Sequence, residues 1–240
     1  ITVTVTPQVI REMKPGERSF FTVSVTASPN VPRGRYALTF SISAREIGFR
    51  AAQPTNVETL QRYLRDNNFS ARVLAAESLA RMGDRNAIRY LVRTAMRGDR
   101  DARSRSIRAL GSAGCKKQTG VLKSLLYERD GWIVGNAIMA LGMLRAEKAV
   151  IQQCLHVRDR FVQTCALAAL AMHGEKAPLP YLRRLLNDRD NFVRAAAAWG
   201  LAVVKDKAGI ETLDKLLSIN NVMLRVFIGD ALVYLARSRR

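Results

Sequence analysis

Apolar and polar positions along most of the chain recur at a nearly constant interval. Each copy contains a leucine that stands at a fixed distance after an Asp or Asn. The six pairs are Asn68–Leu79, Asp99–Leu110, Asp130–Leu141, Asp159–Leu170, Asp190–Leu201 and Asn221–Leu232. The pairs follow one another at a period of about 31 residues, a length typical of repeat arrays. We call the Asp or Asn of each pair the zero position.

The pattern within one repeat predicts two helices. After the zero position, apolar or small residues stand at plus 3, 7, 10, 11 and mostly 14, which places them on one face of an α-helix. Before it, apolar residues at minus 8 and minus 4 predict an earlier helix with its own buried face. The Asp or Asn then falls at the N-cap of the second helix, where its side chain accepts backbone N–H bonds. The sequence therefore predicts six helical hairpins.

Two other repeat positions carry specific expectations. Arginines stand at plus four in four copies, and we expect them to bind the zero-position Asp of their own or the adjacent repeat; they are Arg72, Arg103, Arg194 and Arg225. Glycines fall just past the second helix, where a left-handed C-cap is favoured. They are Gly83, Gly114 and Gly174.

The segment from Asp190 to Leu201, with Arg194 at plus four among Val and Ala, resembles the HEAT-repeat pattern. The period is shorter than the common HEAT length and resembles the short HEAT-like repeats of phycobilin lyase subunits. The resemblance covers residues 55–238, with zero positions at 68, 99, 130, 159, 190 and 221. It implies an α-solenoid and is unspecific for function.

The N-terminal segment follows a different pattern. Alternating β-branched and aromatic residues at 2–6, 21–26 and 36–43 predict strands, separated by turns that contain Pro and Gly. This order resembles the C-terminal half of an immunoglobulin-like module of bacterial cell-surface type. A closed sandwich has about seven strands, and the chain begins at Ile1, so we expect a partial module over residues 1–50. The predicted fold class is mostly α, a solenoid preceded by a small antiparallel β module.

Charge adds a candidate binding surface. The formal net charge is +19, from 39 basic and 20 acidic residues, and such an excess bears on partners rather than on fold. In the second repeat Arg85, Arg89, Arg93 and Arg97 are spaced by four and share one side of the predicted helix. With Arg100, Arg105 and Arg108 they form the candidate basic ridge. The predicted first helix of this repeat holds no acidic residue to neutralise it. A solvated face is the alternative.

A second candidate surface is an apolar inner groove on the flank of the second helices. Positions plus 2, 6, 9 and 13 follow helical spacing and are rich in aromatic residues and Met in the later repeats. The candidate groove residues are Trp132, Met139, Met143, Met172, Trp199 and Tyr234. Such a groove could hold a peptide helix or a flat ligand. The alternative is packing between repeats, which we favour for Phe161 and Phe192.

No catalytic motif is present in the sequence. Two histidines, His156 and His173, are too few for the His-Glu pairs with which the deoxyhypusine hydroxylases, a HEAT family, hold iron. No Cys/His spacing suits zinc, and no phosphate loop or nucleophile motif occurs. We therefore predict no metal and no cofactor. Of the cysteines, we expect Cys154 in the core and Cys165 near a surface.

We predict a non-enzymatic scaffold that docks a protein partner with an acidic surface inside a larger assembly. Binding of nucleic acid or another polyanion is the alternative. A chromophore lyase, implied by the resemblance, or a DNA glycosylase that uses Trp132, Trp199 and Asp230 ranks lower. No apolar run reaches the length of a membrane span. The immunoglobulin-like resemblance favours export to the periplasm or surface of a bacterium over the cytoplasm, and the identity of the partner and the oligomeric state stay open.

Overall fold

The computed structural model describes residues 2–6, 22–26 and 57–237. The chain divides into two units, Ile1–Thr55 and Asn56–Arg240, and each is described by itself. The predicted domain limits, 1–50 and 55–238, stay a prediction.

In the first unit, β1 (Thr2–Thr6) and β2 (Thr22–Thr26) pair antiparallel, with Thr2 opposite Thr26 and Thr6 opposite Thr22. The third predicted strand, 36–43, lies outside the described residues. The described residues thus show one antiparallel pair and do not identify an immunoglobulin-like topology.

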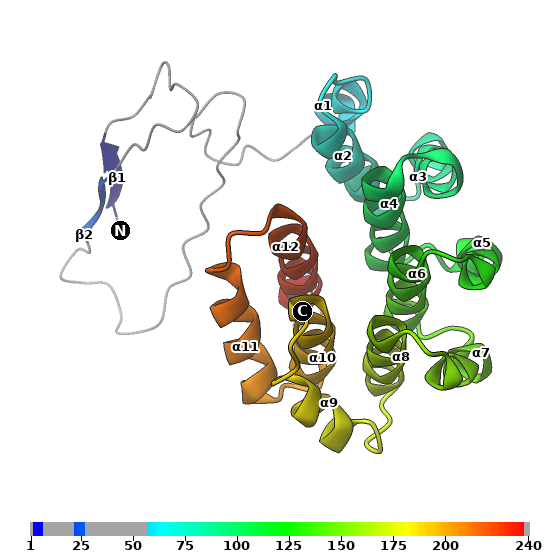
Figure 1. The fold of residues 1–240 in the computed structure, drawn as a ribbon. Coiled ribbons are helices and arrows are strands. Elements are labelled where there is room, and N and C mark those ends of the chain that lie inside the picture. The colour runs from blue at the N-terminus through cyan, green and yellow to red at the C-terminus, as the bar shows by residue number, and fades with distance from the viewer. Residues whose placement is uncertain (1, 7–21, 27–56, 238–240) are drawn as a thin grey trace. The chain divides into compact units, whose positions relative to one another are not determined.

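From residue 57 to residue 237 the chain forms an α-solenoid of six helical hairpins, as predicted (Figure 1). The first helices of the hairpins are α1 (Val57–Tyr63), α3 (Arg85–Arg97), α5 (Thr119–Ser124), α7 (Lys148–Gln153), α9 (Leu179–Leu185) and α11 (Lys207–Leu217). The second helices are α2 (Phe69–Arg81), α4 (Arg100–Ser112), α6 (Gly131–Met143), α8 (Arg160–Met172), α10 (Asn191–Val203) and α12 (Val222–Arg237). Three short 3₁₀ turns, η1 (Lys116–Gln118), η2 (Leu125–Tyr127) and η3 (Cys154–His156), flank α5 and follow α7.

The zero positions are the N-caps of the second helices. The Asn68 side chain accepts from the Ser70 backbone N–H at 2.9 Å, and that of Asp99 accepts from Ala102 at 2.8 Å. The same bond is made by Asp130, Asp159, Asp190 and Asn221. Five of the leucines paired with them are buried in the core, where each contributes about 2 kcal/mol of hydrophobic stabilisation, and Leu232 is half-buried against it.

The plus-four side chains bind a different partner from the one expected. Arg194 donates from Nε to the Leu186 carbonyl, and Arg225 donates to the Leu217 carbonyl in the same way. Arg103 and Gln163 reach the equivalent carbonyls of Ala95 and Leu155, at minus four in their own repeats. The prediction of an Asp–Arg ladder is therefore wrong. The zero-position carboxylate is occupied with backbone N–H groups, and the arginine instead satisfies carbonyls at the end of the first helix.

A left-handed residue ends the second helix in five repeats. Gly83, Gly114 and Gly174 have φ of 86°, 75° and 90°, which confirms the predicted C-caps. The same repeat position holds Arg145 and Lys205, with φ of 50° and 64°. A side chain there carries a steric cost that glycine avoids.

Small residues bring the second helices close together. A Cβ added to Gly142 of α6 would lie 2.7 Å from the Cβ of Ala169 in α8, and one added to Gly111 of α4 would lie 2.7 Å from the Cα of Ala140 in α6. These approaches stack α4, α6 and α8 into one inner layer, with α3, α5 and α7 outside it (Figure 1).

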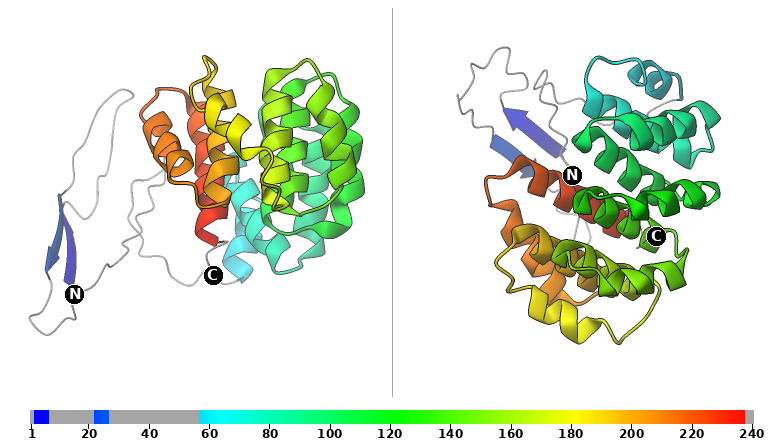
Figure 2. Two further views of the ribbon diagram at one scale, coloured as in Figure 1. Left: turned by 90° about the horizontal axis from the view of Figure 1, so that it is seen from below. Right: turned by 45° about the vertical axis from the view of Figure 1, so that its right-hand side comes forward.

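The array curls until its last repeat packs across its inner side. Both views of Figure 2 and Figure 1 place α11 and α12 on the side of the inner layer away from α5 and α7. The Phe227 ring of α12 lies 5.7 Å from the ring of Trp132 in α6 and 5.3 Å from that of Trp199 in α10, between ring centroids. Arg108 of α4 donates from Nε to a carboxylate oxygen of Asp230 in α12 at 2.6 Å. The second and sixth repeats are thus in direct contact.

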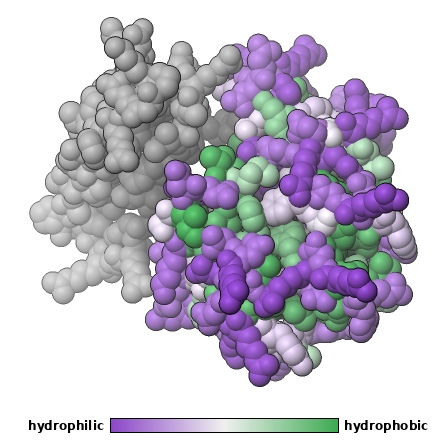
Figure 3. All heavy atoms as spheres, viewed as in Figure 1, coloured by the Kyte–Doolittle hydropathy of each residue, from purple (hydrophilic) through white to green (hydrophobic). Residues whose placement is uncertain are grey.

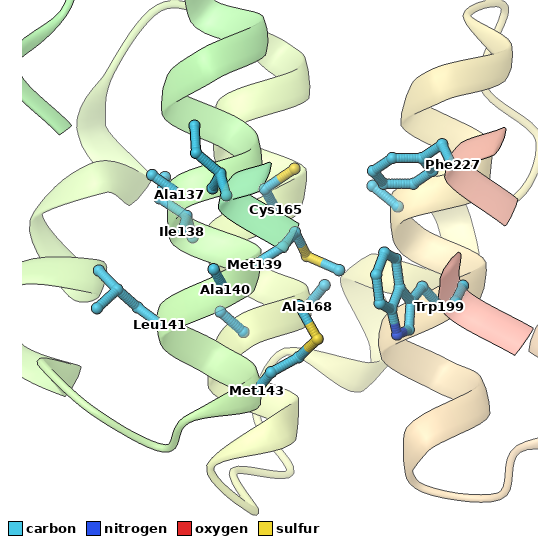
Figure 4. Close-up of a cluster of buried hydrophobic side chains, with 14 of the residues drawn as sticks. Ala137, Ile138, Met139, Ala140, Leu141, Met143, Cys165, Ala168, Trp199 and Phe227 are labelled. Carbon is cyan, nitrogen blue, oxygen red and sulfur yellow. The ribbon is translucent and has the colours of Figure 1, made fainter. Parts of the chain in front are cut away.

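This closure fills the predicted inner groove. Figure 4 shows Met139 and Met143 of α6 pointing toward Trp199 and Phe227. Met139 and Trp199 have no exposed surface, while Trp132, Met143 and Met172 are also buried and Tyr234 is half-buried. The prediction of an open groove at these positions is wrong, because the apolar stripe of the later repeats packs against α12 of the same chain.

The left-handed caps give a first prediction. Replacing Arg145 or Lys205 with glycine relieves the backbone cost, and we expect each change to stabilise the fold by about 0.5–1 kcal/mol in urea unfolding. Arg145→Ala is the matched control, since it removes the side chain and keeps the Cβ. A gain for alanine equal to that for glycine would show that the side chain, rather than the backbone, carries the cost.

A second prediction concerns the contact between the second and sixth repeats. Arg108 is 2% exposed and Asp230 is 36% exposed. Asp230→Ala removes one partner of a mostly buried ion pair, so we expect a loss of about 1–3 kcal/mol in the free energy of unfolding. Asp214→Ala, on the exposed side of α11, should change it by less than about 0.5 kcal/mol. Adding Arg108→Met to Asp230→Ala should recover part of the loss, and equal effects of the two Asp variants would contradict the role of the pair.

Candidate binding site

The candidate site is built on three parallel rows of side chains along α3. The side chain of Asp84 caps this helix by accepting from the backbone N–H groups of Asn86 and Ala87. The first row, Ala87, Leu91 and Ala95, is fully buried against the inner layer. Because side chains four residues apart share one side of a helix, the buried row fixes the directions of the other two.

The second row is apolar and partly open. Ile88 and Val92 are half-buried, and Met96 is 43% exposed. Across from this row stand Lys117 and Gln118 of η1 and Val121 of α5, and together they line a groove of about 770 Å³. Apolar side chains therefore line the groove from both walls: Ile88, Val92 and Met96 from α3, and Val121 from α5.

The third row is the basic part of the groove. Arg89, Arg93 and Arg97 line it from α3, Lys117 lines it from η1, and no acidic residue is among the described side chains that line it. Arg85 continues the row by one turn and is exposed. Within residues 57–237, Arg85, Arg93 and Arg97 have no ion-pair partner, and Arg89 donates to the side-chain oxygen of Asn86. Among the described residues, no acidic side chain compensates this positive charge.

The rest of the predicted basic ridge lies elsewhere. Arg100 pairs with Asp130 at 2.7 Å, and this hydrogen bond lowers the pKa of the Asp130 carboxyl. Arg105 lies 3.3 Å from an Asp101 carboxylate oxygen and donates to the Ser70 hydroxyl at 2.6 Å. Arg108 is buried, so its assignment to a contact surface is wrong. These three arginines lie on α4 and link repeats, whereas the four on α3 face outward.

A second cavity, of about 230 Å³, lies between α2, α4 and α12. The charged side chains that line it are paired with charges of the same chain: Glu77 with Arg81, Arg105 with Asp101, and Arg108 with Asp230. Of these pairs, Arg108–Asp230 joins the second and sixth repeats, and the other two lie within α2 and α4.

The structure shows little that could perform chemistry. Among the described residues, no group of three or more His, Cys, Asp and Glu could hold a metal ion. Trp132 and Trp199 are core residues and Asp230 pairs with Arg108, so the glycosylase-like arrangement of these three is wrong. In the part of the chain that the structure describes, no helix is both long and apolar enough to cross a membrane.

Comparison with known proteins bears on the fold. Residues 148–225 match the family model for HEAT repeats. This segment is therefore similar to HEAT repeats. The match runs from α7 into the first turn of α12, and no curated protein sequence matches the chain.

Three solved structures show some similarity to this chain. Human deoxyhypusine hydroxylase in complex with glycerol is 15% identical, with a TM-score of 0.41, and the alignment covers 75% of this chain and 84% of that chain. The complex of CpcE and CpcF of phycocyanin lyase from Nostoc sp. PCC7120 is 22% identical, with a TM-score of 0.40 and coverage of 85% and 80%. A designed armadillo repeat protein is 18% identical, with a TM-score of 0.32 and coverage of 75% and 100%.

The sequence identified the arginines of α3 but not the opposite wall of the groove. Lys117 and Val121 belong to the next repeat, and nothing in their local pattern indicates that they face α3. Phe227 was also missed as the centre of the aromatic cluster. It stands at plus six in the last repeat, which is the signal that could have placed it on the inner stripe.

The cysteines give a third prediction. Cys154 is buried as expected, but Cys165 is fully buried and the expectation of a surface position is wrong. Burial raises the pKa of all three thiols, most strongly that of Cys165. Thiolate is therefore scarce in the folded protein, and we expect iodoacetamide to label Cys165 on the order of 100-fold more slowly at about pH 8 than in urea, with the rate rising with pH. Mass spectrometry of the labelled peptides measures this, and equal rates in the two conditions would contradict the burial.

Proposed function

We propose that this HEAT-type array is a non-enzymatic scaffold that docks an acidic protein surface in the groove between α3 and α5. The observation that carries the proposal is the row of Arg89, Arg93 and Arg97, which has no acidic partner among the described residues, beside an open apolar row. Interfaces commonly combine an apolar centre with a charged rim, and arginine is enriched in them.

Charge complementarity supports an acidic partner. Opposite charges on the two surfaces speed association and exclude wrong partners, while the apolar contact area holds the complex together. The groove offers both elements within one face of a rigid helix. In Figure 3, hydrophilic residues cover much of the visible face of the helical unit, and hydrophobic residues show between them across its centre and lower right.

The chemistry of the groove favours protein over nucleic acid. Sites for single strands combine cations with aromatic side chains on which bases stack, and no aromatic residue is among the described residues that line this groove. Ile88, Val92 and Val121 would instead face sugars and phosphates, which gain nothing from an apolar floor. Binding of a nucleic acid is therefore measured beside binding of an acidic polypeptide.

The fourth prediction tests this function directly. A short fluorescent polyglutamate chain should bind at about 50 mM salt and weaken at about 300 mM, because the Debye length shortens. Arg89→Glu/Arg93→Glu should weaken binding by about tenfold or more, since it replaces attraction with repulsion. Fluorescence polarisation measures both effects.

The matched control is Arg158→Glu/Arg189→Glu, which changes two exposed arginines outside the groove and lowers the net charge by the same four units, from +19 to +15. It should bind like the unchanged protein. Equal losses of affinity in the two double variants would show that net charge alone, and not the groove, causes the effect. A labelled DNA oligonucleotide that binds more tightly than polyglutamate would favour the polyanion function, and the absence of any binding at low salt would rule out both.

We also propose that the paired strands β1 and β2 belong to an immunoglobulin-like module and that the protein is exported. The antiparallel pairing of Thr2–Thr6 with Thr22–Thr26 supports the first of these. An experimental structure of the unit Ile1–Thr55 that lacks two facing sheets would contradict it.

A further inference from the structure

We infer that the occupant of the groove between α3 and α5 is an amphipathic acidic α-helix that lies along α3. This inference rests on the proposed function and specifies its partner. The carboxylates of the partner would face Arg89, Arg93 and Arg97, and its apolar side chains would cover Ile88, Val92 and Met96.

The spacing of the cations fits a helix. Residues four apart on α3 lie about 6 Å apart along the axis, and the row from Arg85 to Arg97 spans about 18 Å. A helical partner that carries an acidic residue at every fourth position presents carboxylates at the same interval. Three turns of partner helix therefore match the whole row, with one carboxylate for each arginine.

The apolar row favours a partner helix that carries apolar side chains as well as acidic ones. Met96 is 43% exposed and Val92 half-buried, so the row offers apolar surface that solvent still reaches. An apolar stripe beside the acidic stripe of the partner would cover it. Met is well suited to this contact because its flexible thioether adapts to different neighbours.

The backbone of the groove excludes an extended partner. Helix α3 and helix α5 satisfy their backbone groups internally, and the described lining residues include no strand edge. A strand laid in this groove would leave its own N–H and C=O groups unpaired against side chains. A helix brings no such groups, because it pairs them within itself.

The charge of the chain excludes a second copy as the occupant. Two copies that each carry a net charge of +19 repel one another. This repulsion opposes the docking of a second copy in the groove. The occupant is therefore a partner of opposite charge.

The experiment uses two designed peptides of identical composition. In the patterned peptide, Glu stands at every fourth position with Leu at the third position after each Glu, so that both stripes share one face of a helix. In the permuted peptide the same residues are distributed around the helix. We expect the patterned peptide to bind the full chain about tenfold more tightly than the permuted one, by fluorescence polarisation, and to gain helical circular dichroism on binding.

Variants of the protein test the two rows separately. Met96→Gln should weaken binding of the patterned peptide about fivefold and leave binding of polyglutamate unchanged, because only the helical partner contacts the apolar row. Met82→Gln is the matched control, since Met82 is 61% exposed at the end of α2 and lies outside the groove. Arg89→Glu/Arg93→Glu should weaken the binding of both the patterned peptide and polyglutamate.

The outcomes separate this inference from the proposed function. Equal affinity of the patterned and permuted peptides, with polyglutamate still bound through Arg89 and Arg93, would overturn the helical partner and leave the acidic docking site in place. Equal effects of Met96→Gln and Met82→Gln would overturn the role assigned to the apolar row. Failure of all three ligands to bind at low salt would overturn the proposed function together with the inference.

Discussion

The packing of α12 against the inner layer is the contact on which the rest of this array depends. An open solenoid leaves its inner face in water, whereas here that face carries Trp132, Met139 and Trp199, which need cover. Phe227 supplies the cover, and the Arg108–Asp230 pair fixes the place at which the two ends of the array meet. With the inner face used as a core, the surface that remains for partners is the outer one, where α3 and α5 form their groove.

The basic groove arises because the arginines of the second repeat fall into two groups, one on α4 and one on α3. Those on α4 point inward or toward neighbouring repeats and find acidic or polar partners in the chain. Those on α3 point away from the array, and the described residues across the groove from them are Lys117, Gln118 and Val121. The same repeat thus uses one set of cations to hold the fold together and leaves another set exposed. The position of each arginine on its helix, rather than the total charge, decides between the two roles.

Much of the fold could be predicted because it depends on local and periodic signals. The zero-position caps, the left-handed glycines and the leucine of each core all follow from a residue and its near neighbours. The plus-four arginines were assigned the wrong partner, since the sequence cannot show that Leu186 and Leu217 offer free carbonyls to them while the Asp is occupied. The prediction of an open inner groove was wrong for a different reason. Its residues were correctly placed on one stripe, but the curvature that brings Phe227 onto them accumulates over all six repeats, and no single repeat encodes it. Of the candidate site, the α3 arginines were predicted and the facing wall was not.

The contact between Arg108 and Asp230 joins residues 122 positions apart in the sequence. In an open array every repeat touches only its neighbours, so hairpins can be inserted or lost at modest cost. Here both members of the pair stand at the same place in their repeats, plus nine from the zero position, and four hairpin steps separate them. Inserting one hairpin would carry the sixth repeat past the second and leave Arg108 opposite a different surface. The closure therefore fixes the number of hairpins between the second and sixth repeats.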